Sequence, residues 1–202
     1  MATASRTDST GDRIIAAATA EFARYGIAGA RVERIAKAAR TSKERVYAHF
    51  RSKEALYRFV AARELAAMTV AVELDPADLP AYAGRVHDHL VRHPERLRLM
   101  MWGQLELPAG QAPPDDPFQA SVRHKVEQLR DAQKAGALDA VWAPEDVLVF
   151  VSQLATSWAA QADHAPAGAD RDRFMAARRA AIVAAVQRLF PAAANKAAPD
   201  EG

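Results

Sequence analysis

The sequence predicts an all-α fold, and three observations support this prediction. Residues that favour helices, above all Ala, Leu, Arg and Glu, dominate the composition. No stretch sustains the alternation of apolar and polar residues that a half-buried strand requires. Neither Asn-Gly nor Asp-Gly, the dipeptides typical of tight β-hairpins, occurs in the 202 residues.

The first part of the chain is expected to hold four helices. The first runs from about 10 to 24 and ends at Gly26, which can cap its C-terminus. The spacing predicts that one face of it is buried through Ile14, Ile15, Ala18, Phe22 and Tyr25. The other three are expected near 32–39, 43–50 and 53–72.

Pro-rich breaks at 74–80 and 107–117 separate longer helices in the rest of the chain. These helices are expected near 80–92, 95–106, 117–135, 144–163 and 170–190. The Ala-rich, polar tail 191–202 is expected to be disordered.

The last two of these helices are rich in Ala and β-branched residues, so they can approach another helix closely. Their expected apolar faces hold Val147, Val151, Leu154, Ala155 and Trp158, and Phe174, Ala177, Ala181, Ile182, Ala185 and Leu189. These faces can complete an internal core or form a two-fold dimer interface.

Composition excludes several functions. There are no cysteines, so disulfides, zinc-thiolate sites and cysteine nucleophiles are excluded, and a reducing cytoplasm is expected. The N-terminus lacks the pattern of a signal peptide, and no apolar run is long enough to span a membrane. The protein is therefore expected to be soluble and cytoplasmic.

Charge is divided unevenly along the chain. Residues 1–63 hold 13 Lys and Arg against 6 Asp and Glu, a net charge of +7, whereas residues 64–202 hold 14 against 19, a net charge of −5. Such a division is typical of a protein that binds a polyanion with its N-terminal end. A chance distribution of solvated surface charge is the alternative.

The stretch AARTSKERVYAHFRSKEALY, residues 38–57, predicts two helix starts about ten residues apart. In the short helix 43–50, Val46 and Phe50 share the face that must be buried, because a helix of this length is unstable alone. Together with the helix before it, this helix predicts a helix-turn-helix, whose second helix enters the major groove of DNA.

The outward side chains of this stretch suit contacts with DNA. Lys43 and Arg45 can donate to guanine, and Tyr47 and His49 to phosphate oxygens. Lys53 opposes the dipole of the next helix, beside the predicted N-cap Ser52, and this placement makes sense if an anion binds there. Alternatively, Tyr47 only packs against the domain and His49 only ends its helix.

Glu44 is unusual in this stretch, because DNA repels a carboxylate. Thr41 and Glu44 fit a capping box, in which the carboxylate accepts from the Thr41 N–H. Alternatively, Glu44 accepts a hydrogen bond from a cytosine amino group. With Arg40, Thr41 and Ser42, these residues complete the predicted DNA-binding set of Arg40, Thr41, Ser42, Lys43, Glu44, Arg45, Tyr47, His49 and Lys53.

Residues 14–57 resemble the N-terminal DNA-binding domain of the TetR family of bacterial repressors. The matching features are A-x-x-x-F-A-x-x-G from Ala18 to Gly26, Ile35-Ala36, and Y-x-H-F-x-S-K-E-x-L from Tyr47 to Leu56. The resemblance implies domains at 1–52, for DNA binding, and at 74–190, for ligand binding and dimerisation, linked by the helix 53–73. It also implies a homodimer, formed here by helices 144–163 and 170–190, on a palindromic operator that a small-molecule effector releases.

The chain departs from the family pattern at the turn before the recognition helix. The family usually has Gly at the position of Arg40, where the backbone leaves the second helix with positive φ. It usually has Thr and Ser where Ala30 and Arg31 stand, so a hydroxyl contact to phosphate is missing. The charges of Arg31 and Arg40 can replace this contact.

An effector site is expected where aromatic, Met and Gln residues are more numerous than a core requires. The candidates are Met101, Trp102, Gln104, Phe118, Phe150, Gln153 and Trp158. They indicate a small, largely apolar effector, although each one taken singly is more typical of an ordinary core.

Other functions have weaker support. His89 and His93 share a helical face, as zinc ligands sometimes do, but no third ligand follows at a suitable spacing, so neither a metal nor a cofactor is expected. An enzyme is not expected, because no nucleophile elbow, phosphate loop or carboxylate pair occurs. A constitutive DNA-binding protein, whose C-terminal part only dimerises, is the main alternative to a ligand-responsive repressor.

Overall fold

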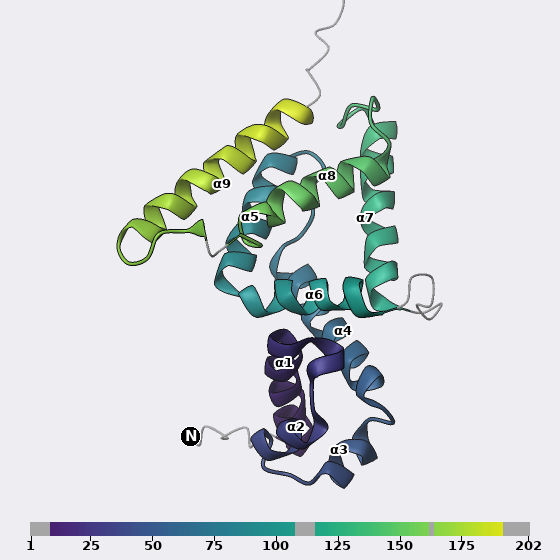
Figure 1. Ribbon diagram of the computed structural model, residues 1–202. Helices are drawn as coiled ribbons and strands as arrows, with labels where there is room; N and C mark the ends of the chain where they lie inside the picture. Colours follow the sequence, from purple (N-terminus) through teal and green to yellow (C-terminus); the bar gives the residue numbers. More distant parts are fainter. Residues whose placement is uncertain (1–8, 108–115, 162–163, 192–202) are drawn as a thin grey trace, which may run out of the picture. The chain divides into compact units, whose positions relative to one another are not determined.

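The computed structural model describes residues 9–107, 116–161 and 164–191, and these ranges contain nine α-helices and no strand (Figure 1). The all-α prediction is therefore confirmed for the described part of the chain. Each predicted helix occurs, and most ends lie within two residues of the predicted ones. The C-terminal ends of α1 and α8 differ most. The predicted disordered tail lies outside the described residues, apart from Pro191.

The chain folds into two compact units. The first takes the described residues of Met1–Ala67 and His93–Pro117, and the second those of Met68–Arg92 and Phe118–Gly202. The sixth helix therefore belongs with the N-terminal helices, although the fifth helix lies between them in the sequence.

The first unit is built from α1 (Thr10–Gly29), α2 (Val32–Ala38), α3 (Lys43–His49), most of α4 (Lys53–Ala71) and α6 (Pro94–Glu106). Ser9 begins α1, since its hydroxyl accepts a hydrogen bond from the Asp12 N–H at 3.1 Å. Gly26, the predicted C-terminal cap, breaks the helical backbone with a φ of +70° that favours glycine, but it does not end α1. One further helical turn follows it, which explains why the helix extends beyond residue 24.

The core of the first unit contains the apolar faces that the sequence predicts. Ile14, Ala18, Phe22, Ile35 and Val46 are almost completely buried. The prediction for Tyr25 is wrong. Its ring is 39% exposed and lies against two guanidinium groups, those of Arg24 at 5.1 Å and Arg34 at 4.5 Å. A tyrosine can remain at the surface because cation–π contacts cover its ring.

The second unit contains α5 (Leu79–Arg92), α7 (Pro117–Lys134), α8 (Pro144–Ser157) and α9 (Asp170–Leu189). Helix α5 packs against both α8 and α9, and α8 also contacts α9. Eight residues of α5 are buried, because it has neighbours on two sides. Helix α7 is buried mainly through Val126 and Leu129.

The prediction that α8 extends to 163 is wrong. The helix ends at Ser157, and the hydroxyls of Thr156 and Ser157 donate to carbonyls of the preceding turn. In α9 the buried residues are Met175, Ile182 and Val186, whereas Ala177, Ala181 and Leu189 of the predicted apolar face are exposed and do not complete an internal core. The large side chains of α9 occupy the face toward α5 and leave a row of small alanines outside.

Candidate nucleic-acid interface

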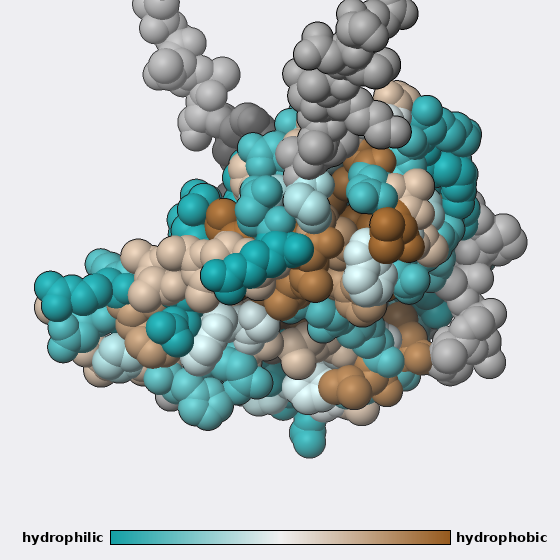
Figure 2. Space-filling view, turned by 90° about the horizontal axis from the view of Figure 1, so that it is seen from above, coloured by the Kyte–Doolittle hydropathy of each residue, from teal (hydrophilic) through white to brown (hydrophobic). Residues whose placement is uncertain are grey.

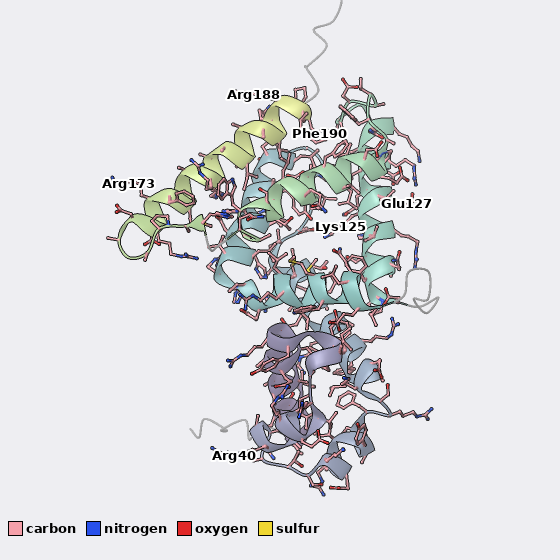
Figure 3. All side chains as sticks on the ribbon, viewed as in Figure 1. Arg40, Lys125, Glu127, Arg173, Arg188 and Phe190 are labelled. Atoms are coloured by element: carbon pink, nitrogen blue, oxygen red, sulfur yellow. The ribbon has the colours of Figure 1, made fainter. Side chains whose placement is uncertain are left out.

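The turn between α2 and α3 is a Schellman motif with an arginine at its left-handed position. Arg40 has a φ of +52°, and Figure 3 shows it where α2 ends. The Arg40 N–H donates to the Lys37 carbonyl at 3.2 Å, and the Thr41 N–H to the Ala36 carbonyl at 2.9 Å. This backbone conformation is the one expected where the family has glycine, so the turn keeps its geometry at the cost of strain in Arg40.

Helix α3 begins at Ser42. The Ser42 hydroxyl accepts a hydrogen bond from the Arg45 N–H at 3.2 Å. The predicted capping box between Thr41 and Glu44 is therefore wrong, because the Thr41 N–H is used in the preceding turn. Hydrogen bonds from its own backbone N–H and from Ser42 lower the pKa of the Glu44 carboxyl, so this exposed side chain carries its charge at neutral pH.

The buried face of α3 is narrow and its outer face is polar. Val46 is 1% exposed and Phe50 packs at the edge of the core, as predicted. Every other side chain of α3 is exposed: Lys43, Glu44, Arg45, Tyr47, Ala48 and His49. The structure thus places five predicted DNA-binding residues of α3 together on one accessible surface.

One of these cations is held in place from α2. The Lys43 ammonium lies in a salt bridge with the Glu33 carboxylate, and this contact raises the pKa of Lys43 and lowers the pKa of Glu33. Both side chains are largely exposed, so the pair is weak and can exchange for a DNA contact. The guanidinium of Arg45 remains on the same exposed face.

Lys53 has a role that the sequence analysis missed. Ser52 caps α4 as predicted, because its hydroxyl accepts from the Ala55 N–H at 3.0 Å. The Lys53 ammonium, however, donates to the carbonyls of Ala28 at 3.1 Å and Ala30 at 3.3 Å. It therefore ties the start of α4 to the segment between α1 and α2, which explains why a lysine is tolerated at a helix N-terminus.

Other polar side chains that fix α1 and α2 also escaped the sequence analysis. Glu21 accepts hydrogen bonds from the Arg31 N–H at 2.9 Å and from the Arg34 Nε at 2.7 Å. Arg13 Nε donates to the carbonyl of Ala39 at 3.1 Å, at the end of α2. Helical spacing does not predict these hydrogen bonds, because their partners are 10 to 26 residues apart in the sequence.

Helix α6 is anchored to the rest of the first unit at three places. A Glu106 carboxylate oxygen accepts from the Ala28 N–H at 2.7 Å. The Trp102 ring lies so close to Gly26 that a Cβ on this glycine would stand 3.0 Å from it. Tyr57 donates to the Leu99 carbonyl at 2.6 Å, and burial raises the pKa of Tyr57 to about 12.

The candidate effector residues are distributed over both units. Helix α6, in the first unit, carries Met101, Trp102 and Gln104. Of these three, Trp102 packs its ring against Gly26. In the second unit Phe150 forms an edge contact with Trp142 at 5.5 Å, and Trp158 does so with Phe174 at the same distance. Phe118 and Gln153 are exposed.

His87 and His89 of α5, and His93 before α6, do not belong to a metal site in the described structure. His87 and His89 are buried, and His93 Nδ1 lies 3.4 Å from a Glu95 carboxylate oxygen. The described ranges contain no group of three or more His, Cys, Asp or Glu side chains placed to hold a metal ion. Within the same ranges, none of the helices combines the length and apolar character needed to cross a membrane.

Family comparisons agree with the helix-turn-helix geometry. Residues 14–60 match the family described as "Bacterial regulatory proteins, tetR family". Residues 78–188, more than half of the chain, match "Tetracyclin repressor-like, C-terminal domain". Both units are therefore covered by models of one family.

Individual proteins give the same result. The chain is 37% identical over 153 residues to the HTH-type transcriptional repressor SCO4008 of Streptomyces coelicolor, covering 75% of this chain and 79% of that protein. It is 34% identical over 105 residues to the HTH-type transcriptional repressor NicS of Pseudomonas putida, covering 48% and 49% of the two chains. The crystal structure of SCO4942 from S. coelicolor is 51% identical, covers 91% of this chain and 99% of its own, and superimposes with a TM-score of 0.77. The chain therefore belongs to the TetR family of bacterial transcriptional regulators, which are DNA-binding proteins and not enzymes.

Proposed function

We propose that this protein represses transcription in the cytoplasm by binding a palindromic operator as a homodimer, with α3 of each protomer in a major groove. The observation that carries this proposal is the exposed face of α3, where Lys43, Arg45, Tyr47 and His49 stand on a helix held by Val46. Repression follows the names of the two curated relatives. Two recognition helices of a dimer reach successive major grooves about 34 Å apart.

The roles of the DNA-contacting residues differ. Arg45 is proposed to read a guanine, because its guanidinium is exposed near the N-terminus of α3. Tyr47, 41% exposed, is proposed to contact a phosphate, with His49 in the same role. Lys53 is proposed to act through the backbone of Ala28 and Ala30, which it holds in place, as well as through its charge.

The experiment begins with operators recovered from random DNA by in vitro selection, followed by fluorescence anisotropy with the full chain. Tyr47→Ala is expected to weaken binding to every sequence, whereas Arg45→Ala is expected to relax the preference at one base pair by about 1 to 3 kcal/mol. Lys37→Ala, a change at an exposed cation of α2, serves as the control. If Arg45→Ala keeps the full preference, Arg45 does not read a base, and if no sequence is enriched, the proposed function is wrong.

The proposed dimer interface uses the outer faces of α8 and α9. Val149 is 54% exposed and Phe150 39% exposed on the face of α8 opposite its buried residues. On α9, Ala177, Ala181 and Ala184 follow one another at helical spacing and are all exposed. Small residues on one helix and large apolar residues on the other are suited to close two-fold packing. Figure 2 shows uncovered apolar patches among polar side chains on one face of the molecule.

For the effector we propose a small, largely apolar molecule. Two of the candidate residues outside the proposed dimer interface leave apolar side chains uncovered: Met101 is 43% and Phe118 38% exposed. A thermal-shift screen with hydrophobic metabolites tests this proposal, because a ligand that releases DNA must bind the protein measurably. If compounds stabilise the protein but none weakens operator binding, the alternative of a constitutive DNA-binding protein is favoured.

A further inference from the structure

A groove of about 430 Å³ opens between α5 and α9 in the second unit. Val91 of α5 and Met175 and Ala176 of α9 form its apolar lining. The groove shares no residue with the DNA-binding face or with the candidate effector residues. Its volume lies in the lower part of the range for small-molecule sites.

His87 belongs to the lining of this groove, and one nitrogen of its buried imidazole has no hydrogen-bond partner. The side chain is 1% exposed, and its Nδ1 lies 3.3 Å from the Ala155 carbonyl oxygen of α8. Since a carbonyl can only accept, the proton belongs on Nδ1 and Nε2 carries the lone pair. Nε2 is buried and has no hydrogen-bond partner among the described residues. Burial lowers the pKa of His87, so the neutral form dominates and Nε2 is an acceptor without a donor.

Charged groups border the same groove. Arg179 Nε donates to Asp88 Oδ2 at 2.7 Å, and Arg92 Nε donates to the Asp88 carbonyl oxygen at 3.0 Å. Gly84 leaves room for this arrangement, because a Cβ there would stand 2.8 Å from Arg179 Nη2. In these bonds each arginine uses its Nε–H, so the Nη groups can bind a ligand. Two guanidinium groups and one carboxylate give the groove a net positive charge.

We propose that this groove binds a small organic carboxylate that also carries an O–H or N–H donor. The carboxylate would lie against the Nη groups of Arg92 and Arg179, where bidentate hydrogen bonds are available. The donor would satisfy His87 Nε2, and the apolar body would contact Val91 and Met175. The proposal goes beyond DNA binding and does not depend on it.

The proposed dimer leaves the groove accessible. Met175 and Arg179 lie on the side of α9 that faces α5, because they stand at helical spacing from the buried Ile182 and Val186, and Ala176 lies at the edge of this side. The alanines proposed for the dimer interface lie on the opposite side of the same helix. A ligand can therefore enter this groove in a monomer or in a dimer.

The test uses the full chain and three isomeric probes, 2-, 3- and 4-hydroxybenzoate, which carry the same charge but place the hydroxyl at different distances. Calorimetric titration is expected to show millimolar or tighter binding of at least one isomer. Benzoate, which lacks the donor, and the matching hydroxybenzamide, which lacks the charge, are each expected to bind about tenfold more weakly. Nitrogen NMR of the imidazole is expected to show a shift of His87 Nε2 when the hydroxybenzoate binds.

Variants locate the site. Arg92→Gln is expected to reduce the affinity about tenfold, and it changes a residue whose side chain is exposed. Arg173→Gln and Arg188→Gln, labelled on α9 in Figure 3, change arginines outside the groove and are expected to leave the affinity unchanged. Operator binding is measured in parallel, so failure of the groove and failure of the DNA-binding function are distinguished. The proposal is overturned if no isomer binds, if binding leaves the His87 resonance unmoved, or if Arg92→Gln binds like the controls.

Discussion

At the scale of single residues, the turn before α3 shows how one side chain can serve binding at the expense of stability. The left-handed conformation of Arg40 is a property of the turn, which needs positive φ at this position whatever residue fills it. An arginine there is strained by about 1 kcal/mol relative to glycine, but it adds a cation beside the recognition helix. Its exposed position is consistent with a phosphate contact.

We expect Arg40→Gly to raise the free energy of unfolding by about 1 kcal/mol, because the strain is removed, and to weaken operator binding, because a charge is lost. Urea unfolding and anisotropy measure the two effects. Arg31→Gly is the matched control, since Arg31 has an ordinary φ of −122°. It is expected to lose charge without gaining stability. Equal stability changes in the two variants would show that Arg40 is not strained.

At the scale of helices, α6 fixes the segment that leads from α1 to the helix-turn-helix. At the C-terminal end of α6, the Glu106 carboxylate accepts a hydrogen bond from the Ala28 N–H. At the start of α4, the Lys53 ammonium donates a hydrogen bond to the Ala28 carbonyl. One short segment thus receives its donor and its acceptor from two different helices. A displacement of α6 is therefore expected to shift the backbone at the start of α2.

Glu106→Ala is expected to lower the free energy of unfolding by about 0.5 to 1.5 kcal/mol, since the exposed Ala28 N–H exchanges its charged acceptor for water. Glu106→Gln retains an oxygen that can accept, so it is expected to recover much of this loss. Gln104→Ala, at an exposed position of α6, is the control for helix propensity. Thermal or urea unfolding distinguishes these variants. A loss in Gln104→Ala as large as in Glu106→Ala would contradict the anchoring role.

The buried His87 makes the packing of α5 against α8 and α9 sensitive to acid. Its pKa is lowered mainly by burial, and Asp88 opposes this effect while Arg179 reinforces it. Below pH 6.5, the ordinary pKa of histidine, His87 binds a proton in the unfolded chain but stays neutral in the folded chain. The contribution of this histidine to stability is therefore present above pH 6.5 and is lost as the pH falls toward the lower pKa of the folded state.

Between pH 7 and pH 5 the free energy of unfolding is expected to fall by up to about 1.4 kcal/mol per pH unit through this residue. His87→Phe, which cannot bind a proton, should show a shallower pH dependence, whatever its absolute stability. His124→Phe changes an exposed histidine of α7 and should keep the wild-type dependence. Parallel pH profiles for all three proteins would exclude His87 as the cause.

At the scale of the whole molecule, the proposed homodimer depends on the surface of the second unit. The outer faces of α8 and α9 hold apolar side chains that the described structure leaves uncovered. Operator binding by the proposed mechanism needs two recognition helices, so DNA affinity and assembly should be lost together.

Ala181→Glu is expected to give a monomer with operator affinity reduced at least about tenfold, because it buries a charge in the proposed interface. Sedimentation and anisotropy measure the two properties. Ala120→Glu makes the same change at an exposed position of α7 and should leave both unchanged. A dimer of unchanged affinity with Ala181→Glu would place the interface elsewhere.

The sequence by itself determined the helical fold, most helix ends and the recognition helix, because these depend on local spacing and on caps that lie within four residues of their partners. The same local information identified Val46 and Phe50 as the inner face of α3. It failed for Tyr25, and for α9 it left open whether the predicted apolar face lies in the core, because helical spacing allows more than one face and the neighbouring helix selects one.

Only the tertiary structure decided which distant groups meet. It placed α6 beside α1, gave Lys53 two carbonyl partners and left His87 Nε2 without a donor in a groove between α5 and α9. Such hydrogen bonds join residues 23 to 78 positions apart in the first unit, and no periodicity in the sequence predicts them. These polar groups find or lack a partner according to which helices pack together, and this can be known only once the helices are assembled.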